Sequence, residues 1–285
     1  MTMSTSTLKR LSLLAAIAAI SLSSISYWWQ KKHYVNTDDA YINANIVQIA
    51  PRVTGQVTQL HIQNNQYVTL NQPLFDIDST PFEIAATEAL AQLEKNQSQL
   101  NIATLTSNRM VKLVKKNVAS EQEGDNVEAN LRSAMAAIQL GEANLKKVKL
   151  DLSYTKVAAP LSGWVTNVTL RSGSIVQANQ PLFALISDEV FWVDANFKET
   201  DISKIHADQK VDVIVDMYPK HHFKGIVESI SGGSGTAFSL LPPQNATGNW
   251  VKVTQRVPVR VRIINPDREH PLRIGTSATV KIHIG

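Results

Sequence analysis

The sequence predicts a mixed α and β protein in which a long helical hairpin interrupts one small β domain and a β-barrel follows. Apolar residues recur at helical spacing from about Ser79 to Leu152, with no proline after Pro81. The segments on the two sides of this run resemble each other. After Asp188, apolar and polar residues alternate, which is typical of strands that place one face on a core. These three observations predict the fold class.

An N-terminal membrane anchor is the first predicted element. Residues 11–29 carry no charge and are flanked by basic pairs at 9–10 and 31–32. At roughly 1.5 Å of rise per residue such a helix spans about 28 Å, close to the hydrocarbon thickness of a bilayer. Aromatic residues at its end match an interfacial belt. A cleaved signal peptide is the alternative, because residues 21–26 are small and rich in serine.

A repeated sequence predicts two equivalent halves of one β domain. The first half covers residues 49–75, preceded by a polar lead-in strand at 36–45, and the second covers residues 158–183. The pentapeptide NQPLF occurs unchanged in both halves, at 71–75 and 179–183. Five further pairs align at a constant offset: Gly55 with Gly163, Val57 with Val165, Ile62 with Leu170, Asn65 with Gly173 and Val68 with Val176.

The interrupting run predicts two helices joined by a turn at Asn117–Ser120. Thr80 is the expected N-cap of the first helix, and Ser120 with Glu123 predicts a capping box for the second. Heptad spacing predicts an antiparallel coiled coil over residues 79–152. The expected seams are Ala86, Leu90, Leu93, Gln97, Leu100, Thr104, Ser107, Val111 and Val114 in the first helix, and Val127, Leu131, Ala134, Ile138, Gly141, Leu145, Val148 and Leu152 in the second.

The C-terminal part predicts five or six strands that form a small barrel. A short helix is expected at 201–206, and the glycine- and proline-rich residues 231–248 predict a long loop.

Composition excludes several functions. The chain lacks cysteine, which removes disulfides, thiol catalysis and zinc–thiolate sites. Net charge is only +4 and no basic stripe carries aromatic residues, so we expect no nucleic-acid partner. The seven histidines are scattered, and only His221 and His222 adjoin. No phosphate-binding loop or catalytic triad stands out. We therefore expect no enzyme, and no catalytic, metal-binding or cofactor-binding residues.

This organisation resembles the HlyD-family membrane fusion proteins, the periplasmic adaptors of tripartite efflux and secretion systems. The amino-acid sequence is similar to that of the EmrA-type subgroup at Thr37–Val57, Phe191–Ile202 and Gly235–Val261. The resemblance implies that the split halves close into a biotinyl/lipoyl-like domain. The implied domains are 1–10 cytoplasmic N-terminus, 11–29 transmembrane anchor, 36–78 first lipoyl half with its lead-in strand, 79–152 helical hairpin, 154–187 second lipoyl half and 188–285 β-barrel.

The resemblance also implies a function and a site. Members of the subgroup serve an inner-membrane transporter of the major-facilitator type and an outer-membrane channel of the TolC type, in export of drugs or small toxic compounds. They are homo-oligomers, for which a trimer or a hexamer is expected. The family's channel-docking pattern is an arginine, a leucine four residues later and a serine seven beyond. Arg109, Leu113 and Ser120 match it beside the predicted turn.

Other interpretations stay open at this stage. Arg109 has a purely local explanation as a solvated charge, Leu113 as packing near a helix end and Ser120 as a cap. An adaptor of an ABC-type secretion system has the same architecture with a protein cargo. A biotin or lipoyl carrier is a rival, although its lysine-bearing turn is replaced by the helices between Asp78 and Tyr154. A tethering coiled-coil protein without a role in transport is the remaining alternative.

Overall fold

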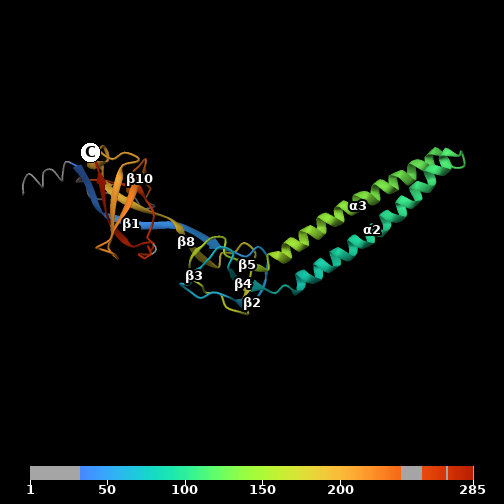
Figure 1. Cartoon of the computed structure of the whole chain (residues 1–285), viewed down its shortest axis with the longest axis horizontal. Coiled ribbons are helices and arrows are strands. Elements are labelled where there is room, and N and C mark those ends of the chain that lie inside the picture. The colour runs from blue at the N-terminus through green and yellow to red at the C-terminus, as the bar shows by residue number, and fades with distance from the viewer. Residues whose placement is uncertain (1–32, 239–251, 268, 285) are drawn as a thin grey trace, which may run out of the picture. The chain divides into compact units, whose positions relative to one another are not determined.

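The computed structural model describes residues 33–238, 252–267 and 269–284 (Figure 1). The predicted anchor at 11–29 lies outside the described residues, as does the predicted loop from residue 239 onward. Within the described ranges, no helix combines the length and the apolar character needed to cross a bilayer.

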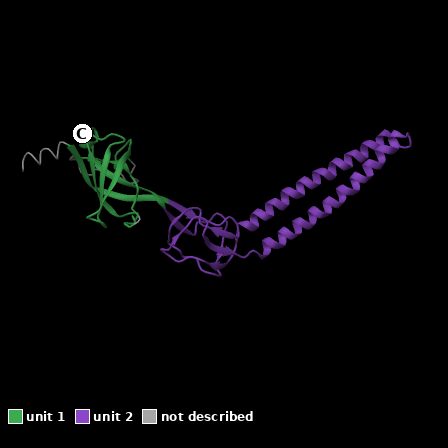
Figure 2. Ribbon diagram, in the orientation of Figure 1, with its two compact units in different colours: residues 1–45, 188–285 green, residues 46–187 purple. Residues whose placement is uncertain are grey.

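The described residues divide into two compact units, coloured separately in Figure 2. The barrel unit contains the residues up to Asn45 and those from Asp188 onward, and the hairpin unit contains Ile46–Ser187. The helices are α2 (Thr80–Lys115), α3 (Glu121–Ser153) and α4 (Glu199–Ile202), with a 3-10 turn, η1, at Gly235–Phe238. The strands are β1 (Tyr34–Ile49), β2 (Gly55–Leu60), β3 (Tyr67–Val68), β4 (Pro73–Ile77), β5 (Lys156–Ala158), β6 (Gly163–Thr166), β7 (Ile175–Val176), β8 (Phe183–Lys198), β9 (Lys210–Val215), β10 (His222–Ile230), β11 (Arg256–Ile263) and β12 (Ser277–His283).

The barrel unit is a closed sheet. Its strands follow the order β1-β12-β9-β10-β11-β8, and pairing between β1 and β8 closes the ring. Side chains alternate between the inside and the surface, so that Val211, Val213 and Val215 of β9 are buried while the residues between them are half-exposed. Closure leaves no free sheet edge. The predicted C-terminal barrel is therefore confirmed.

One boundary differs from the prediction. We expected the lead-in strand at 36–45 to belong to the first β half. It is part of β1 instead and pairs antiparallel with β12 of the barrel unit, with Thr37 opposite Val280 and Ala40 opposite Ala278. Alternation in a sequence identifies the face of a strand that is buried, but it does not identify the neighbouring strand.

The two sequence halves of the hairpin unit exchange strands. Strand β2 of the first half pairs with β7 of the second, with Gly55 opposite Val176. Strand β6 of the second half pairs with β3 of the first, with Gly163 opposite Val68. The aligned residues thus occupy equivalent places, and each half completes the other. Each of these strands also pairs within its own half, β2 with β4 and β6 with β8.

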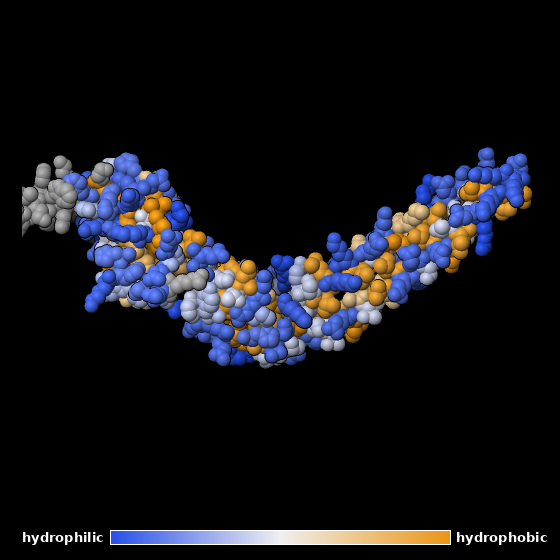
Figure 3. Space-filling view, viewed as in Figure 1, coloured by the Kyte–Doolittle hydropathy of each residue, from blue (hydrophilic) through white to orange (hydrophobic). Residues whose placement is uncertain are grey.

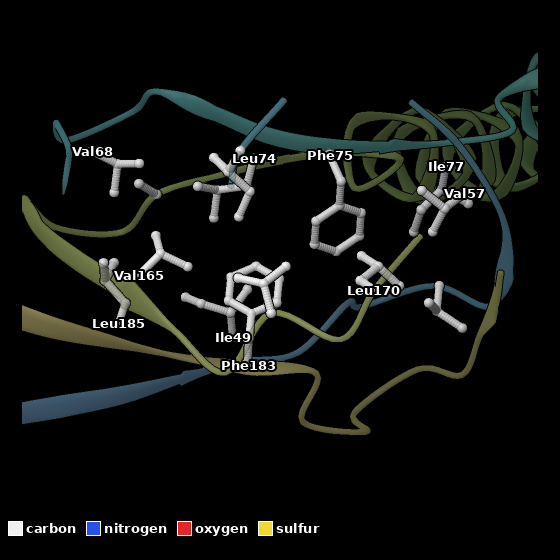
Figure 4. Close-up of a cluster of buried hydrophobic side chains, with 14 of the residues drawn as sticks. Ile49, Val57, Val68, Leu74, Phe75, Ile77, Val165, Leu170, Phe183 and Leu185 are labelled. Carbon is white, nitrogen blue, oxygen red and sulfur yellow. The ribbon is translucent and has the colours of Figure 1, made fainter. Parts of the chain in front are cut away.

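The core of the hairpin unit is built from the aligned positions (Figure 4). Phe75 and Phe183, which end the two copies of NQPLF, meet edge to face with their ring centroids 6.1 Å apart. Val57 and Val165 are also equivalent in the repeat, and both are buried. The repeat in the sequence therefore reports a repeated contribution to one shared core.

Gly163 permits the close approach of β6 to β8. A Cβ atom built at this position would lie 1.9 Å from the backbone oxygen of Ile186, closer than any side chain permits. Its counterpart Gly55 would instead meet the end of the Ile77 side chain, at 2.5 Å. Both glycines are needed for packing, but only Gly163 lies against backbone.

The start of α2 differs by one residue from the prediction. We expected Thr80 to be the N-cap, but Thr80 is already helical and its N–H donates to the Asp78 carboxylate at 3.0 Å. Donation from the Thr80 hydroxyl, followed by donation from its N–H, lowers the pKa of Asp78. The N-cap residue is Ser79, whose side chain makes no cap hydrogen bond, and the Asp78 carboxylate accepts instead at this helix end, which carries a partial positive charge.

Helices α2 and α3 pack along each other, and the seam of α3 contains the eight residues expected, all of them buried or half-buried. The seam of α2 differs from the prediction, because Leu90 and Val111 are exposed, as is Gln97. The predicted seam positions alternate in steps of four and then three residues from Ala86, whereas the observed positions alternate in steps of three and then four. The observed seam is Phe82, Ala86, Ala89, Leu93, Asn96, Leu100, Ala103, Ser107, Met110 and Val114, and the predicted seam residue Thr104 is half-buried beside Ala103.

Small residues explain this choice. Ala89, Ala134 and Gly141 are the buried residues of the two helices, so the helix axes approach closely there. A larger leucine at position 90 is accommodated better at the flank, where 43% of it is exposed. Asn96 lies in the seam and donates from Nδ2 to the Ala137 carbonyl of α3 at 3.0 Å.

Candidate functional site

Backbone hydrogen bonds at the C-terminus of α2 fix one side of the turn at the end of the hairpin. Asn117 takes the left-handed conformation, with φ of 55°. Its N–H donates to the Val114 carbonyl at 2.9 Å, and the N–H of Val118 donates to the Leu113 carbonyl at 3.0 Å. These two bonds form a Schellman motif, which satisfies the last carbonyls of the helix. The backbone of the tip is therefore held in one conformation at this end.

The start of α3 fixes the other side of the turn. The Ser120 Oγ accepts from the N–H of Glu123 at 3.2 Å, and the Glu123 carboxylate accepts from the N–H of Ser120 at 2.9 Å. The predicted capping box is therefore confirmed. Donation from the N–H of Ser120, followed by donation from its hydroxyl, lowers the pKa of Glu123. The carboxylate thus stays ionised beside the positive end of the helix dipole.

The three residues of the docking pattern all lie at this end of the hairpin. Arg109 and Leu113 are one helical turn apart on the surface of α2, and 41% of Leu113 is exposed. Arg109 has no ion pair with any of the residues that the structure describes. Its guanidinium can therefore donate to another molecule. Ser120, by contrast, has both polar atoms engaged in the capping box.

Charge is divided at the tip. The last turn of α2 carries Lys112 and Lys115, and the first turn of α3 carries Glu121 and Glu123. Each set complements the dipole of its own helix. A docking partner would therefore meet a basic side and an acidic side across one short turn.

A groove lies between the helices just behind the turn. It has a volume of about 470 Å³, and its apolar lining comes from Met110, Val111 and Val114 of α2 and from Val127 of α3. Gly124 also lines the groove, and a Cβ atom there would meet the Val114 side chain at 3.4 Å. None of the three docking-pattern residues lines this groove, although all three belong to the described part of the chain.

Several large apolar side chains of the helix pair are exposed outside its seam. Figure 3 shows apolar side chains along the visible face of the two helices. On α2, Ile84, Ile102 and Leu105 are each about half exposed, and on α3 73% of Leu140 is exposed. Side chains of this kind, gathered on one projecting element, are typical of an interaction surface.

Two family models match the chain. The model described as "RND MFP, barrel-sandwich hybrid domain" matches residues 45–188, which is more than half of the sequence. The model described as "AAEA-like beta-barrel domain" matches residues 190–283. The chain belongs to the membrane fusion protein family.

The relatives place it among the EmrA-like members of that family. The chain is 31% identical to the "Multidrug export protein EmrA" of Haemophilus influenzae, over 93% of this chain and 80% of the relative. It is 33% identical to the "Probable multidrug resistance protein EmrK" of Escherichia coli, over 96% of this chain and 84% of the relative. A solved structure described as the "periplasmic adaptor protein EmrA" shares the fold, with a TM-score of 0.51 at 19% identity, covering 88% of this chain and 99% of that one.

Membership in this EmrA-like group confirms the resemblance that the sequence motifs predict. Sequence reasoning also located the turn and the capping box. It missed the Schellman motif, for which an asparagine directly after a heptad helix was the available signal. It also missed the groove beside Gly124. The sequence does not show that this glycine faces Val114 of the other helix, and a glycine indicates a gap only once the residue opposite it is known.

Proposed function

We propose that this chain is the periplasmic adaptor of a tripartite efflux system, anchored in the inner membrane by residues 11–29. It would join a transporter of the major-facilitator type to an outer-membrane channel of the TolC type, for export of drugs or small toxic compounds. The observation that carries the proposal is the match of both β modules to membrane fusion proteins, together with the relatives that are named multidrug export and resistance proteins.

The hairpin is the part of the chain that we assign to the channel. Its turn is held at both sides, by the Schellman motif and by the capping box, so docking would lose little conformational entropy. Arg109 would donate to acceptors of the channel, Leu113 would supply an apolar contact, and Ser120 would hold the turn in place. An ordered tip with an unpaired guanidinium fits this assignment better than a purely structural turn, which needs no exposed leucine.

The same features support assembly into a homo-oligomer, which we propose is a trimer or a hexamer. The exposed apolar residues of α2 and α3 would be covered by neighbouring hairpins packed side by side. A closed ring of such copies would form a sealed conduit between the two membranes. The chain would contribute no chemistry of its own, since the energy for export belongs to the transporter.

Growth of a deletion strain on a panel of hydrophobic drugs tests the efflux role. Loss of tolerance to at least one compound, restored by the gene on a plasmid, is expected. Unchanged tolerance to all compounds would favour a tethering role. A gene for an ABC-type ATPase beside this one, instead of a major-facilitator gene, would favour the secretion adaptor.

Arg109→Asp tests the docking assignment. We expect this change to lower drug tolerance to that of the deletion strain, because it reverses the charge that faces the channel. Lys95→Asp is the matched control: Lys95 is also exposed on α2, two heptads nearer the β domain and on the same side of the helix. A photo-crosslinker at position 117 should capture the channel in the control and fail to do so in Arg109→Asp. Normal drug tolerance in Arg109→Asp would refute the assignment.

A further inference from the structure

Two histidines and a carboxylate far apart in the sequence come together at one end of the barrel unit. His221 ends the turn between β9 and β10, and Asp267 and His270 lie in the loop between β11 and β12. Each offers one ligand atom, and these atoms all lie within 4.8 Å of one another. Among the described residues this is the one group of three or more such side chains.

The cluster is held by contacts on both loops. The His221 and His270 rings are stacked, with centroids 4.2 Å apart and planes within 19°. The His270 Nδ1 lies 2.7 Å from the Asp267 carboxylate. Tyr218 joins the loops, because its hydroxyl donates to the Pro271 carbonyl at 3.1 Å and its ring meets His270 edge to face. The three ligand side chains are therefore presented by anchored backbone.

Two other histidines of the described chain contact carboxylates, and they provide a contrast. His61 pairs with Asp76 and His283 pairs with Asp212, each as a single histidine with a single carboxylate. Neither pair has a second imidazole beside it within the described residues. The third histidine–carboxylate pair differs, because His221 lies directly against it.

The donor set and the space around it favour one class of ligand. Two imidazole nitrogens and one carboxylate oxygen suit late first-row divalent ions such as Zn²⁺ and Cu²⁺, whereas Ca²⁺ and Mg²⁺ prefer oxygen. Ligand atoms around tetrahedral Zn²⁺ lie roughly 3.4 Å apart, so the two stacked rings, whose in-plane nitrogen lone pairs are nearly parallel, would have to turn to point at one ion. Both side chains are half-exposed, which allows that turn. A hollow of about 340 Å³ opens beside the two histidines, lined also by Met217, Tyr218 and Lys220. The lysine is exposed, so its ammonium can turn into solvent.

We propose that His221, Asp267 and His270 form a binding site for a divalent late first-row transition ion, with Zn²⁺ as its representative. Three protein ligands leave the fourth position to water, so the ion would exchange with solution. A bound ion would join the β9–β10 turn to the β11–β12 loop through two coordinate bonds from one side and one from the other. This site is separate from the hairpin tip and does not depend on the proposed transport role.

Titration of the purified full chain with ZnCl2, followed by calorimetry, tests the site. We expect one Zn²⁺ per chain. Binding should be at least about tenfold weaker in His221→Ala and in His270→Ala, because loss of a group that only supports a metal ligand already weakens binding by about that factor. Asp267→Asn should weaken binding similarly, while it preserves the size of the side chain. His222→Ala is the matched control, since His222 is exposed and adjacent to His221 but is not part of the cluster.

Nuclear magnetic resonance of the histidine rings gives a second readout that a merely structural role would not produce. The ring signals of His221 and His270 should shift on addition of Zn²⁺, and those of His222 should not. Absence of Zn²⁺ binding to the unaltered chain would overturn the proposal. Binding that persists unchanged in both His221→Ala and His270→Ala, with circular dichroism like that of the unaltered chain, would overturn it as well.

Discussion

Ser120 has an observed capping role beside the docking role proposed for it. Its hydroxyl caps α3 through Glu123, and we propose that its place at the turn puts it beside the channel. A residue found by a family pattern therefore has a complete local explanation within this chain. Arg109 forms no ion pair with the described carboxylates, so its only local explanation is that of a solvated charge. The two residues call for different tests.

Substitution of Ser120 separates the cap from the contact. Ser120→Ala should remove about 1 kcal/mol of capping energy and speed hydrogen exchange of the Glu123 amide roughly fivefold. Ser120→Asp should keep exchange near that of the unaltered chain, because aspartate is also a good N-cap. Hydrogen-exchange mass spectrometry checks both. If Ser120→Asp preserves the cap but abolishes drug tolerance, position 120 has a role beyond capping; fast exchange in Ser120→Asp would contradict the prediction.

The helices of the hairpin are held together by a seam whose small residues matter more than its large ones. A Cβ atom at Gly141 would lie 3.1 Å from the Leu93 side chain and 3.2 Å from the Asn96 Nδ2. The same Asn96 donates across the seam to Ala137. A polar residue of this kind in a heptad seam fixes the register of the two helices. Close approach and register thus depend on the same few residues.

Gly141→Leu should open the seam of the hairpin. The added side chain has no room beside Leu93 and Asn96, and overpacking of this kind costs roughly 1–3 kcal/mol. We expect a lower midpoint of thermal unfolding by far-ultraviolet circular dichroism. Gly141→Ala should change the midpoint little, because alanine favours a helix by about 1 kcal/mol over glycine and offsets the tight contact. Ala143→Leu, on the exposed side of α3, is the matched control and should have no effect.

The extent to which the sequence predicts this element follows from what each pattern contains. The eight seam positions of α3 followed from spacing alone, since its apolar residues admit one register. In α2 the larger apolar residues, Leu90 and Val111, lie one position away from the seam, and the smaller Ala89 takes the place expected for Leu90. Heptad spacing in a sequence is assigned from the larger apolar residues, whereas closely packed helices place small residues in the seam. The cluster of His221, Asp267 and His270 was also beyond prediction, because His221 and His270 meet only through the pairing of distant strands.

At the scale of the whole chain, polar contacts tie neighbouring strands of the barrel unit together. Asp212 of β9 contacts Lys224 of β10 and, at 2.9 Å, the ring of His283 of β12. Partial burial alone would raise the pKa of Asp212, but hydrogen bonds from Lys224 and His283 outweigh it, so the pKa is lowered. Three adjacent strands of the ring thus share one ionised carboxylate.

The stability of the barrel unit should therefore depend on pH through Asp212. Because its pKa is lower in the folded chain than in the unfolded chain, the carboxylate stabilises the fold above its ordinary pKa of 3.8 and ceases to do so as pH falls through the folded value. Asp212→Asn should lower the thermal midpoint at about pH 6, and the gap to the unaltered chain should narrow toward about pH 3. Asp216→Asn, directly after the same strand, should leave the midpoint unchanged. A gap that stays constant across this range would contradict the assignment.

The exchange of strands between the two β halves has a consequence for the evolution of the hairpin. The halves hold each other through β2 with β7 and β3 with β6, while α2 and α3 leave and re-enter at Asp78 and Tyr154. The pairing of the two β halves therefore does not depend on the length of the helical hairpin inserted between them. Removing or adding seven residues in each helix preserves both seams and moves the turn by about 10.5 Å. The length of the helical hairpin can therefore change in steps of one heptad without altering the β halves.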